Sequence, residues 1–218
     1  MIEDSRIQAY IESLGTGNGG FLDELEGKCI RDRIPIIRPS MQSILKVLIG
    51  IKAPKNILEV GTATGFSSIL MASCAPDYCR ITTIEKYEKR IPEARENIAR
   101  SGYSDRISLI EGDAAMVLKE LADQKNSYDL VFMDAAKGQY LIFLEDVMKL
   151  LEEGGILVSD NVLQEGDIVQ SRFAVTRRNR TIHSRMREYL YALTHDERLN
   201  TTVLPMGDGV TISVRKIG

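Results

Sequence analysis

The stretch Asn56-Ile-Leu-Glu-Val-Gly-Thr-Ala-Thr-Gly65 decides the fold of this chain. It joins a short apolar segment, which includes Glu59, to a turn flanked by Gly61 and Gly65, and an apolar helical pattern follows over residues 66–75. Glycine lets the backbone approach a ligand closely, and a helix N-terminus directs N–H groups at a negative group. The stretch therefore predicts a strand, turn and helix that cradle a cofactor.

Short apolar segments alternate with amphipathic helical patterns through the rest of the chain. The pattern predicts strands over 56–60, 80–85, 106–110, 130–133, 155–159, 201–204 and 210–215, and helices over 66–75, 88–101, 114–124, 139–151 and 181–194. Apolar strands separated by helices are typical of a parallel sheet covered on both faces. The tight turn Met206-Gly-Asp-Gly209 between the last two strands favours an antiparallel hairpin at the sheet edge. We therefore predict an α/β fold with a doubly wound sheet.

The first part of the chain is predicted to form a helical cap. Helical patterns cover residues 2–14, 21–31 and 39–52, and the prolines of residues 34–39 favour an extended connector between the last two. In the first helix Ile7, Tyr10, Ile11 and Leu14 share one stripe. A length of 218 residues fits one domain, which we divide into a cap over 1–53 and a core over 54–218.

The composition is that of an ordinary soluble protein, with 44% hydrophobic residues, 27% charged residues and a net charge of −3. This balance argues against a generally basic coat for nucleic acid. The three cysteines match no zinc spacing, which favours reduced thiols. The first residues do not resemble a signal peptide, and the longest apolar run, residues 47–51, is too short to span a bilayer. We expect a cytoplasmic protein without membrane contact.

Acidic residues follow or end five successive predicted strands. These are Glu59, Glu85, Asp113, Asp134 and Asp160, the last with Asn161 beside it. A single acidic residue at a strand end is more often a helix N-cap than a ligand. Five in succession are hard to explain by capping alone, and ligands of open α/β sheets bind beyond the carboxyl ends of the strands. The pattern predicts a binding site along this edge.

The first acidic positions suit a nucleoside. A carboxylate at Glu85 is placed to accept hydrogen bonds from a ribose diol. Asp113, in Glu111-Gly-Asp-Ala114, offers an acceptor and a neighbouring backbone N–H to an adenine edge, although it also suits a helix N-cap. A nicotinamide dinucleotide is disfavoured, because the turn lacks the Gly-x-Gly-x-x-Gly spacing.

The last acidic positions suit a metal ion. Asp134, Asp160 and Asn161 supply two carboxylates and an amide oxygen without histidine or cysteine, a donor set that suits Mg²⁺. Lys137 follows Asp134 by three residues, and a lysine beside a dication can accept a proton. A solvated lysine near a helix start is the alternative reading.

With these residues identified, the chain resembles the cation-dependent, S-adenosylmethionine-dependent O-methyltransferases, which include catechol and caffeoyl-CoA O-methyltransferases and bacterial relatives. The resemblance is carried by Glu59-Val-Gly-Thr-Ala-Thr-Gly-Phe-Ser67, Ile84-Glu85, Gly112-Asp-Ala114, Asp134-Ala-Ala-Lys137, Ser159-Asp-Asn-Val162 and Leu204-Pro-Met-Gly-Asp-Gly209. It implies a Rossmann-like, doubly wound sheet of seven strands with the last strand antiparallel, and a homodimer.

The resemblance also implies roles for individual residues. The S-adenosylmethionine site would consist of Ile37, Glu59, Gly61, Gly65, Ser67, Glu85, Asp113, Ala114 and Asp134. Within it, Gly61, Gly65 and Ser67 would hold the methionyl end. Asp134, Asp160 and Asn161 would bind Mg²⁺. Lys137, with Asp134, would assist deprotonation of the acceptor hydroxyl, and the metal would require an acceptor with two neighbouring oxygens.

An arginine-rich segment follows the predicted metal ligands. Residues 172–187 hold six arginines and no acid. On a helical wheel Ile182, Met186, Tyr189 and Leu193 form the buried stripe, while Arg177, Arg180 and Arg187 face away from it with Arg178 and Arg185 flanking. Charge runs usually form a solvated face, but arginine forks suit phosphate groups. We predict an RNA-binding surface of Arg177, Arg178, Arg180, Arg185 and Arg187.

The arginines point to an RNA acceptor. The chain resembles a bacterial subgroup that methylates 5-hydroxyuridine at the wobble position of tRNA, through Ile34-Pro-Ile36, Asp134-Ala-Ala-Lys-Gly-Gln-Tyr140 and the arginine-rich helix. That base offers neighbouring oxygens, and an anticodon loop can present it splayed out. The alternatives are a small catechol or hydroxycinnamoyl-CoA as acceptor, or an RNA-binding module without catalysis, which would have no need of the metal set.

Overall fold

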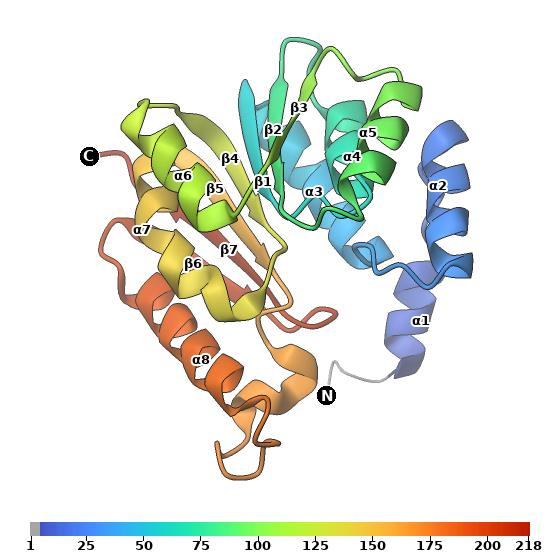
Figure 1. Ribbon diagram of the computed structural model, residues 1–218. Coiled ribbons are helices and arrows are strands. Elements are labelled where there is room, and N and C mark those ends of the chain that lie inside the picture. The colour runs from blue at the N-terminus through green and yellow to red at the C-terminus, as the bar shows by residue number, and fades with distance from the viewer. Residues whose placement is uncertain (1–4) are drawn as a thin grey trace.

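Seven strands form one sheet in the order β3-β2-β1-β4-β5-β7-β6, as Figure 1 shows. The computed structural model describes residues 5–218. The strands are β1 (Asn56–Val60), β2 (Arg80–Glu85), β3 (Ile107–Glu111), β4 (Tyr128–Met133), β5 (Leu151–Asp160), β6 (Leu199–Leu204) and β7 (Val210–Arg215). The pairs among β1 to β5 are parallel, and β7 runs antiparallel to both β5 and β6. The predicted seven-stranded, doubly wound sheet with an antiparallel last strand is confirmed.

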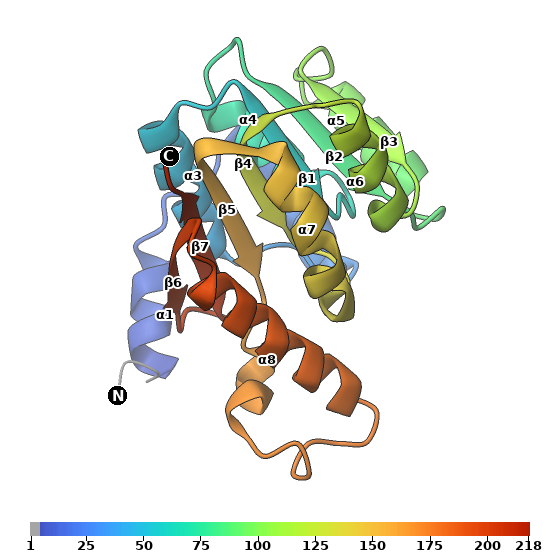
Figure 2. The same cartoon turned by 90° about the vertical axis from the view of Figure 1, so that its left-hand side faces the viewer.

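Helices cover both faces of the sheet (Figure 1, Figure 2). The bounds are α3 (Pro39–Lys52), α4 (Phe66–Cys74) and α5 (Ile91–Arg100) for one face, and α6 (Ala114–Asp123), α7 (Tyr140–Leu150) and α8 (Arg180–His195) for the other. Neighbouring strand residues alternate between two buried clusters: Ile57 packs with the first set of helices and Leu58 with the second. This alternation follows the pleat of the strand. Each strand therefore joins two apolar layers.

The predicted boundaries differ from the structure by a few residues. β5 begins at Leu151 rather than at 155, and α5 begins at Ile91 rather than at 88. Two 3-10 turns, η1 (Lys137–Gln139) and η2 (Gln164–Val169), were not predicted from the sequence. Both turns follow strands that end at the acidic positions, so they shape the loops around the predicted site.

The cap begins with α1 (Ser5–Ser13) and α2 (Gly20–Arg31). Residues 2–4 of the first predicted helix lie outside the described residues. The apolar stripe of α1 is exposed rather than packed on the core, with exposed fractions from 44% for Ile7 to 65% for Tyr10. By contrast, Leu22, Leu25 and Cys29 of α2 are buried in the core.

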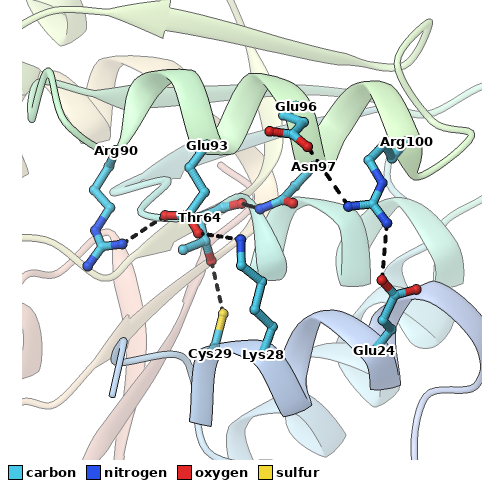
Figure 3. Close-up of polar contacts among 9 residues, drawn as sticks. All are labelled: Glu24, Lys28, Cys29, Thr64, Arg90, Glu93, Glu96, Asn97 and Arg100. Atoms are coloured by element: carbon cyan, nitrogen blue, oxygen red, sulfur yellow. Dashed lines mark hydrogen bonds and ion pairs between the residues drawn. The ribbon is translucent and has the colours of Figure 1, made fainter. Parts of the chain in front are cut away.

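Ion pairs join α2 to α5 at the surface (Figure 3). Lys28 lies 2.9 Å from Glu93, which Arg90 also contacts at 2.8 Å, and Arg100 lies 3.1 Å from Glu24. Exposed pairs of this kind contribute about 0–1 kcal/mol each. The buried apolar side chains of α2 therefore hold the cap in place, and the ion pairs set its orientation.

The same helix reaches the glycine turn through Thr64 (Figure 3). The Sγ atom of Cys29 lies 3.7 Å from the Thr64 hydroxyl, and the Asn97 side-chain amide of α5 donates to the Thr64 carbonyl at 2.9 Å. Both contacts are buried. The cap and α5 therefore fix the turn between β1 and α4 from behind.

Two other expectations concern cysteine and membranes. Cys29, Cys74 and Cys79 are all free, as predicted. Within residues 5–218, no helix is both long and apolar enough to cross a membrane.

Gly61 stands where the ends of β1 and β4 meet. Its φ is +106°, and a Cβ placed there would overlap the carbonyl oxygen of Asp134 and lie 2.9 Å from its carbonyl carbon. The Asp134 N–H donates to the Val60 carbonyl at 3.0 Å, so the two strand ends are bonded side by side. Glycine is required here for both the backbone angle and the close contact.

The close contact of Gly61 can be tested separately from its backbone angle by comparing two glycine replacements. Gly61→Ala should destabilise the protein by at least about 3 kcal/mol, since strain at positive φ and overpacking each cost about 1–3 kcal/mol. Gly102→Ala is the matched control, because Gly102 has φ +81° but no atom within 4 Å of its Cβ position. Urea unfolding of both variants measures the difference, and equal losses would contradict the role of the close contact.

Candidate active site

Two cavities open at the carboxyl ends of β1 and β4. The first, about 170 Å³ and here called the glycine-turn cavity, is lined by Gly61, Glu85, Asp113 and Ala114 among others. The second, about 450 Å³ and here called the carboxylate cavity, is lined by a set that includes Ile37, Arg38, Lys137, Asp160 and Asn161. Ala63, Asp134 and Ala135 belong to both walls. Two molecules bound in these cavities would meet at Asp134.

Glu85 is fixed by backbone N–H groups. One carboxylate oxygen accepts from Ala63 at 2.8 Å, and the other accepts from Lys86 at 2.9 Å and from Tyr87 at 2.8 Å. The carboxylate therefore ties the glycine turn to β2 while it lines the glycine-turn cavity. Each oxygen keeps acceptor capacity, so the predicted hydrogen bonds with a ribose diol remain sterically and chemically available.

Asp113 has the predicted N-cap role, and its predicted contact with adenine stays a prediction. It is the N-cap of α6, where its Oδ1 accepts from the Ala115 N–H at 3.0 Å, and it lines the glycine-turn cavity with Ala114. The hydrogen bond from Lys86, at 3.2 Å, and the one from Ala115 hold the pKa of Asp113 below its usual range. Asp113 therefore faces the cavity as a charged acceptor.

Glu59, Gly65 and Ser67 lie behind the turn, and neither cavity wall includes them. The Glu59 carboxyl is fully buried and accepts hydrogen bonds from Ser68 and, at 2.5 Å, from Thr83. Burial raises its pKa to about 7 against the opposing effect of these hydroxyls and of Ser67. The structure thus brings these three residues to the support of the turn, and their contact with a cofactor stays a prediction.

The predicted metal ligands come together at the ends of β4 and β5. The Asn161 amide donates to Asp134 Oδ1 at 3.2 Å, and the Asn161 N–H donates to Asp160 Oδ1 at 2.7 Å. Burial, followed by the charge of Asp134, raises the pKa of Asp160 to about 7. Burial also raises the pKa of Asp134, while Lys137 opposes that shift.

This donor set fits a divalent cation. The half-buried Asp134 raises the pKa of the buried Asp160, and such a pair favours a positive charge beside it. Hard oxygen donors suit Mg²⁺. Rotating the Asn161 amide would present its oxygen to such an ion, since amide oxygen and nitrogen occupy equivalent places. Across residues 5–218, no three His, Cys, Asp or Glu side chains cluster as a metal site.

Tyr140 was not recognised as a site residue from the sequence. Its hydroxyl accepts from the Ala135 N–H at 3.2 Å and lies 3.1 Å from the Asp160 carbonyl oxygen. Tyr189 of α8 packs edge-on against its ring at 5.4 Å and binds Ser159 through a 2.6 Å hydroxyl contact. These two buried tyrosines hold the ends of β4 and β5 together. In the sequence, each of them appears only as a hydroxyl-bearing side chain on an apolar helix face.

The mouth of the carboxylate cavity joins the cap to the last hairpin. Ile37, only 4% exposed, lines the carboxylate cavity just before α3 and is absent from the wall of the glycine-turn cavity, so its predicted contact with the cofactor stays a prediction. Arg38, the N-cap residue of α3, lies 3.1 Å from Asp208 in the turn between β6 and β7. Two segments that are distant in sequence therefore close one side of the cavity.

The predicted arginine face is partly wrong in its geometry. α8 begins at Arg180, so Arg177 and Arg178 lie in the preceding turn and not on the helix. Both are exposed, and neither has an interaction partner in the part of the chain that the structure describes. The predicted buried stripe is confirmed at Met186, Tyr189 and Leu193, whereas Ile182 is half-buried and His183 takes its place in the interior.

The other three arginines donate to backbone carbonyls: Arg180 to Val175 at 3.3 Å, Arg185 to Gly138 at 2.9 Å and Arg187 to Ile168 at 3.1 Å. These contacts tie α8 to η1, to η2 and to the turn before the helix. Part of the arginine content of this segment is therefore structural, and Arg177 and Arg178 remain free to contact a ligand.

Comparison with known proteins gives consistent matches. A family model described as O-methyltransferase matches residues 16–217. Tapetum-specific methyltransferase 1 of Arabidopsis thaliana is 33% identical over 174 residues, which cover 79% of this chain and 75% of that protein. Caffeoyl-CoA O-methyltransferase 1 of the same plant is 34% identical over 179 residues, with 78% and 68% covered. The structure of an O-methyltransferase from Bacillus cereus in complex with SAH matches with a TM-score of 0.85 and 26% identity, covering 97% of each chain.

The carboxyl pair predicts a pH effect on stability. Because the pKa of Asp160 is raised to about 7 in the folded state, ionisation of this carboxyl opposes folding. The protein is therefore most stable while Asp160 is protonated, and it loses that stability as the pH rises from about 4 to about 7. Without divalent ions, Asp160→Asn should therefore be more stable than the unchanged protein at pH 8, although not at pH 4. Urea unfolding with a chelator at both pH values measures this.

The same variant should lose Mg²⁺ binding, which calorimetric titration measures. Asp105→Asn is the matched control, because Asp105 is exposed, and it should follow the unchanged protein in both experiments. Glu59, whose pKa is also raised, is present in all three proteins and therefore adds the same pH dependence of stability to each. A variant at Asp160 that is less stable at pH 8 would contradict the electrostatic account.

Proposed function

The chain belongs to the O-methyltransferase family, and on this premise we propose that it transfers a methyl group from S-adenosylmethionine to the 5-hydroxyl of 5-hydroxyuridine at the tRNA wobble position, giving 5-methoxyuridine. The observation that carries the proposal is the wall shared by the two cavities, formed by Ala63, Asp134 and Ala135. A methyl donor in the glycine-turn cavity and an acceptor in the carboxylate cavity would face each other there.

S-adenosylmethionine suits the glycine-turn cavity. Glu85 offers carboxylate oxygens for the ribose, and Asp113 with Ala114 offers an acceptor and a backbone N–H for the adenine. The SAH complex of the Bacillus cereus relative supports this assignment. Gly61 leaves the floor of the cavity open, since it carries no side chain.

Asp134, Asp160 and Asn161 would hold Mg²⁺ in the carboxylate cavity. When bound, the ion would supply positive charge that lowers the pKa of an acceptor hydroxyl and favours an acceptor with two neighbouring oxygens. The charge of Asp134, which raises the pKa of Asp160, supports this assignment, because a cation bound between the two carboxyls would offset it.

Residues of the chain itself would position the acceptor and accept the proton of its hydroxyl. Lys137 lines the carboxylate cavity, and its charge acts on Asp134, whose pKa it lowers against the effect of burial. We assign to it the acceptance of the proton from the acceptor hydroxyl. Ile37 and Met41 form the apolar side of the cavity and exclude water, which strengthens the electrostatic interactions inside.

An RNA acceptor fits the charges around the cavity. The 5-hydroxyl and 4-carbonyl of the proposed base are neighbouring oxygens, as in a catechol. Arg177 and Arg178 are exposed near the start of α8, which packs against η1 and η2 beside the site. Guanidinium groups without internal partners are available to the phosphates of an anticodon loop.

A small catechol or a hydroxycinnamoyl-CoA is the second candidate acceptor. It is supported by the caffeoyl-CoA O-methyltransferase of Arabidopsis thaliana, which shares 34% of the aligned residues. The phosphates of coenzyme A would suit the same free arginines. Both candidate acceptors would bind in the carboxylate cavity, so they differ in the parts of the molecule that extend outside it.

We also propose a homodimer, supported by the exposed apolar stripe of α1. Ile7, Tyr10, Ile11 and Leu14 are each 44–65% exposed, and contiguous exposed apolar surface is typical of an interface. Size-exclusion chromatography with light scattering measures the mass. Replacing Ile11 and Leu14 with glutamate should give monomers, and an unchanged dimer would place the interface elsewhere.

Turnover with defined acceptors tests the proposed substrate. Protein supplied with labelled S-adenosylmethionine and Mg²⁺ should methylate tRNA that carries 5-hydroxyuridine, and mass spectrometry of the nucleosides should identify 5-methoxyuridine. Catechol and a hydroxycinnamoyl-CoA are the comparison acceptors. Turnover of these alone would reject the tRNA assignment and favour the second candidate.

The free arginines predict a selective effect on RNA. Arg177→Ala combined with Arg178→Ala should raise the KM for tRNA roughly 10-fold and reduce the salt slope of binding by about two, because two phosphate contacts are lost. Catechol turnover should not change. Arg31→Ala, an exposed arginine at the end of α2, is the control with the same kind of charge loss. An unaltered salt slope would remove these residues from the RNA surface.

A further inference from the structure

Phe173 is exposed at the tip of the segment that precedes α8. Its side chain is 82% exposed, whereas burial of a phenylalanine is usually favourable by about 1.5–3 kcal/mol. The segment projects at the lower end of both views, together with the start of α8 (Figure 1, Figure 2). A ring held in solvent at this place suggests a binding role.

The segment around Phe173 is anchored on both sides. Val175 is buried with 3% exposure, and Ala174 donates its N–H to the Ser171 carbonyl at 2.8 Å. The His183 ring contacts the Gln170 carbonyl oxygen through Nε2 at 3.1 Å. These contacts fix the turn from which the ring projects, so a ligand would meet a prepared surface.

Arginine accompanies the ring. The Arg180 guanidinium lies 5.9 Å from the Phe173 ring centroid, and the same residue donates to the Val175 carbonyl at 3.3 Å. Arg172 is adjacent in sequence and exposed, and it has no partner within residues 5–218. An exposed ring with a guanidinium group beside it and a second arginine next to it in sequence has the composition of surfaces that stack bases of single-stranded nucleic acid.

An open cleft of about 480 Å³ reaches Arg172, the residue before Phe173 in the chain. Arg172, His183, Ser184 and Arg187 line it, and Glu188 is the carboxylate in its wall. Two guanidinium groups against one carboxylate leave a net positive charge. His183 is only 2% exposed, and its Nδ1 has no hydrogen-bond partner in the described chain. The cleft therefore combines a net positive charge with a ring nitrogen that has no hydrogen-bond partner, and both features suit a phosphate group.

We propose that Phe173 and this cleft form a nucleotide subsite for single-stranded RNA, in which a base stacks on the Phe173 ring and the adjoining phosphate binds Arg172 and Arg187. The subsite rests on the proposed tRNA function and deepens it, because it holds a nucleotide other than the one being methylated. The cleft lies next to η2, because Arg187 donates to the Ile168 carbonyl at 3.1 Å, and η2 follows the Asp160-Asn161 pair in the chain. Stacking serves any base, and the subsite therefore contributes affinity and placement rather than sequence choice.

Binding of a fluorescein-labelled anticodon stem-loop RNA, followed by anisotropy, tests the ring. Phe173→Ala should weaken binding about 10-fold, whereas Phe173→Tyr and Phe173→Trp should keep it, because stacking needs only a flat ring. Val169→Ala is the matched control, since Val169 is 80% exposed in the same region and has no ring. Catechol turnover by Phe173→Ala should equal that of the unchanged protein, which shows that the site is intact.

The cleft is tested through salt dependence. Arg172→Ala should lower the slope of log K against log salt by about one, the loss of one phosphate contact, while Phe173→Ala should leave that slope unchanged. Coenzyme A alone, tested as a competitor, distinguishes a phosphate site for a small molecule from one for RNA. If coenzyme A displaces the RNA and Phe173→Ala does not weaken RNA binding, the subsite is overturned.

The outcomes separate the subsite from the proposed function. If the unchanged protein methylates the RNA and Phe173→Ala binds it equally well, the subsite is wrong and the function stands. If the unchanged protein neither binds nor methylates RNA, both are wrong. Anionic phospholipid vesicles serve as a further probe, and binding to them that depends on Phe173 in the absence of RNA binding would assign the ring to a membrane surface instead.

Discussion

The close approach of Gly61 to the backbone of Asp134 is the constraint on which the site depends. It brings the end of β1, which starts the glycine turn, against the end of β4, which supplies the first carboxylate. Strand order reverses at this point, with β2 and β3 on one side and β5 on the other. The two cavities can therefore share one wall only because no side chain separates the two strands.

Residues of β1 and β4 are buried on both faces of the sheet, so these strands appear in the sequence as apolar runs. β1, β2 and β7 agree with the prediction at both ends. β5 does not, because its first part contains the exposed residues Glu152 and Glu153, which give no apolar signal. Pairing with β4 at Leu151, rather than local composition, extends that strand.

The site was predicted where residue type alone specifies the chemistry. Asp134, Asp160 and Asn161 follow strands that the sheet brings side by side, so their proximity follows from the order of the strands. Tyr140 acts through contacts with backbone groups of two strands, which no local pattern reveals. The same is true of Arg185, whose partner is a carbonyl 47 residues away. Tertiary hydrogen bonds of this kind need coordinates.

Asn161 has a backbone requirement as well as a chemical one. Its φ of +60° lies in the left-handed region, which glycine, asparagine and aspartate occupy at least cost. Glycine would remove the side-chain amide, and aspartate would place a further negative charge beside Asp134 and Asp160. Substitution at this position is therefore restricted from two sides, by the backbone angle and by the neighbouring carboxyls.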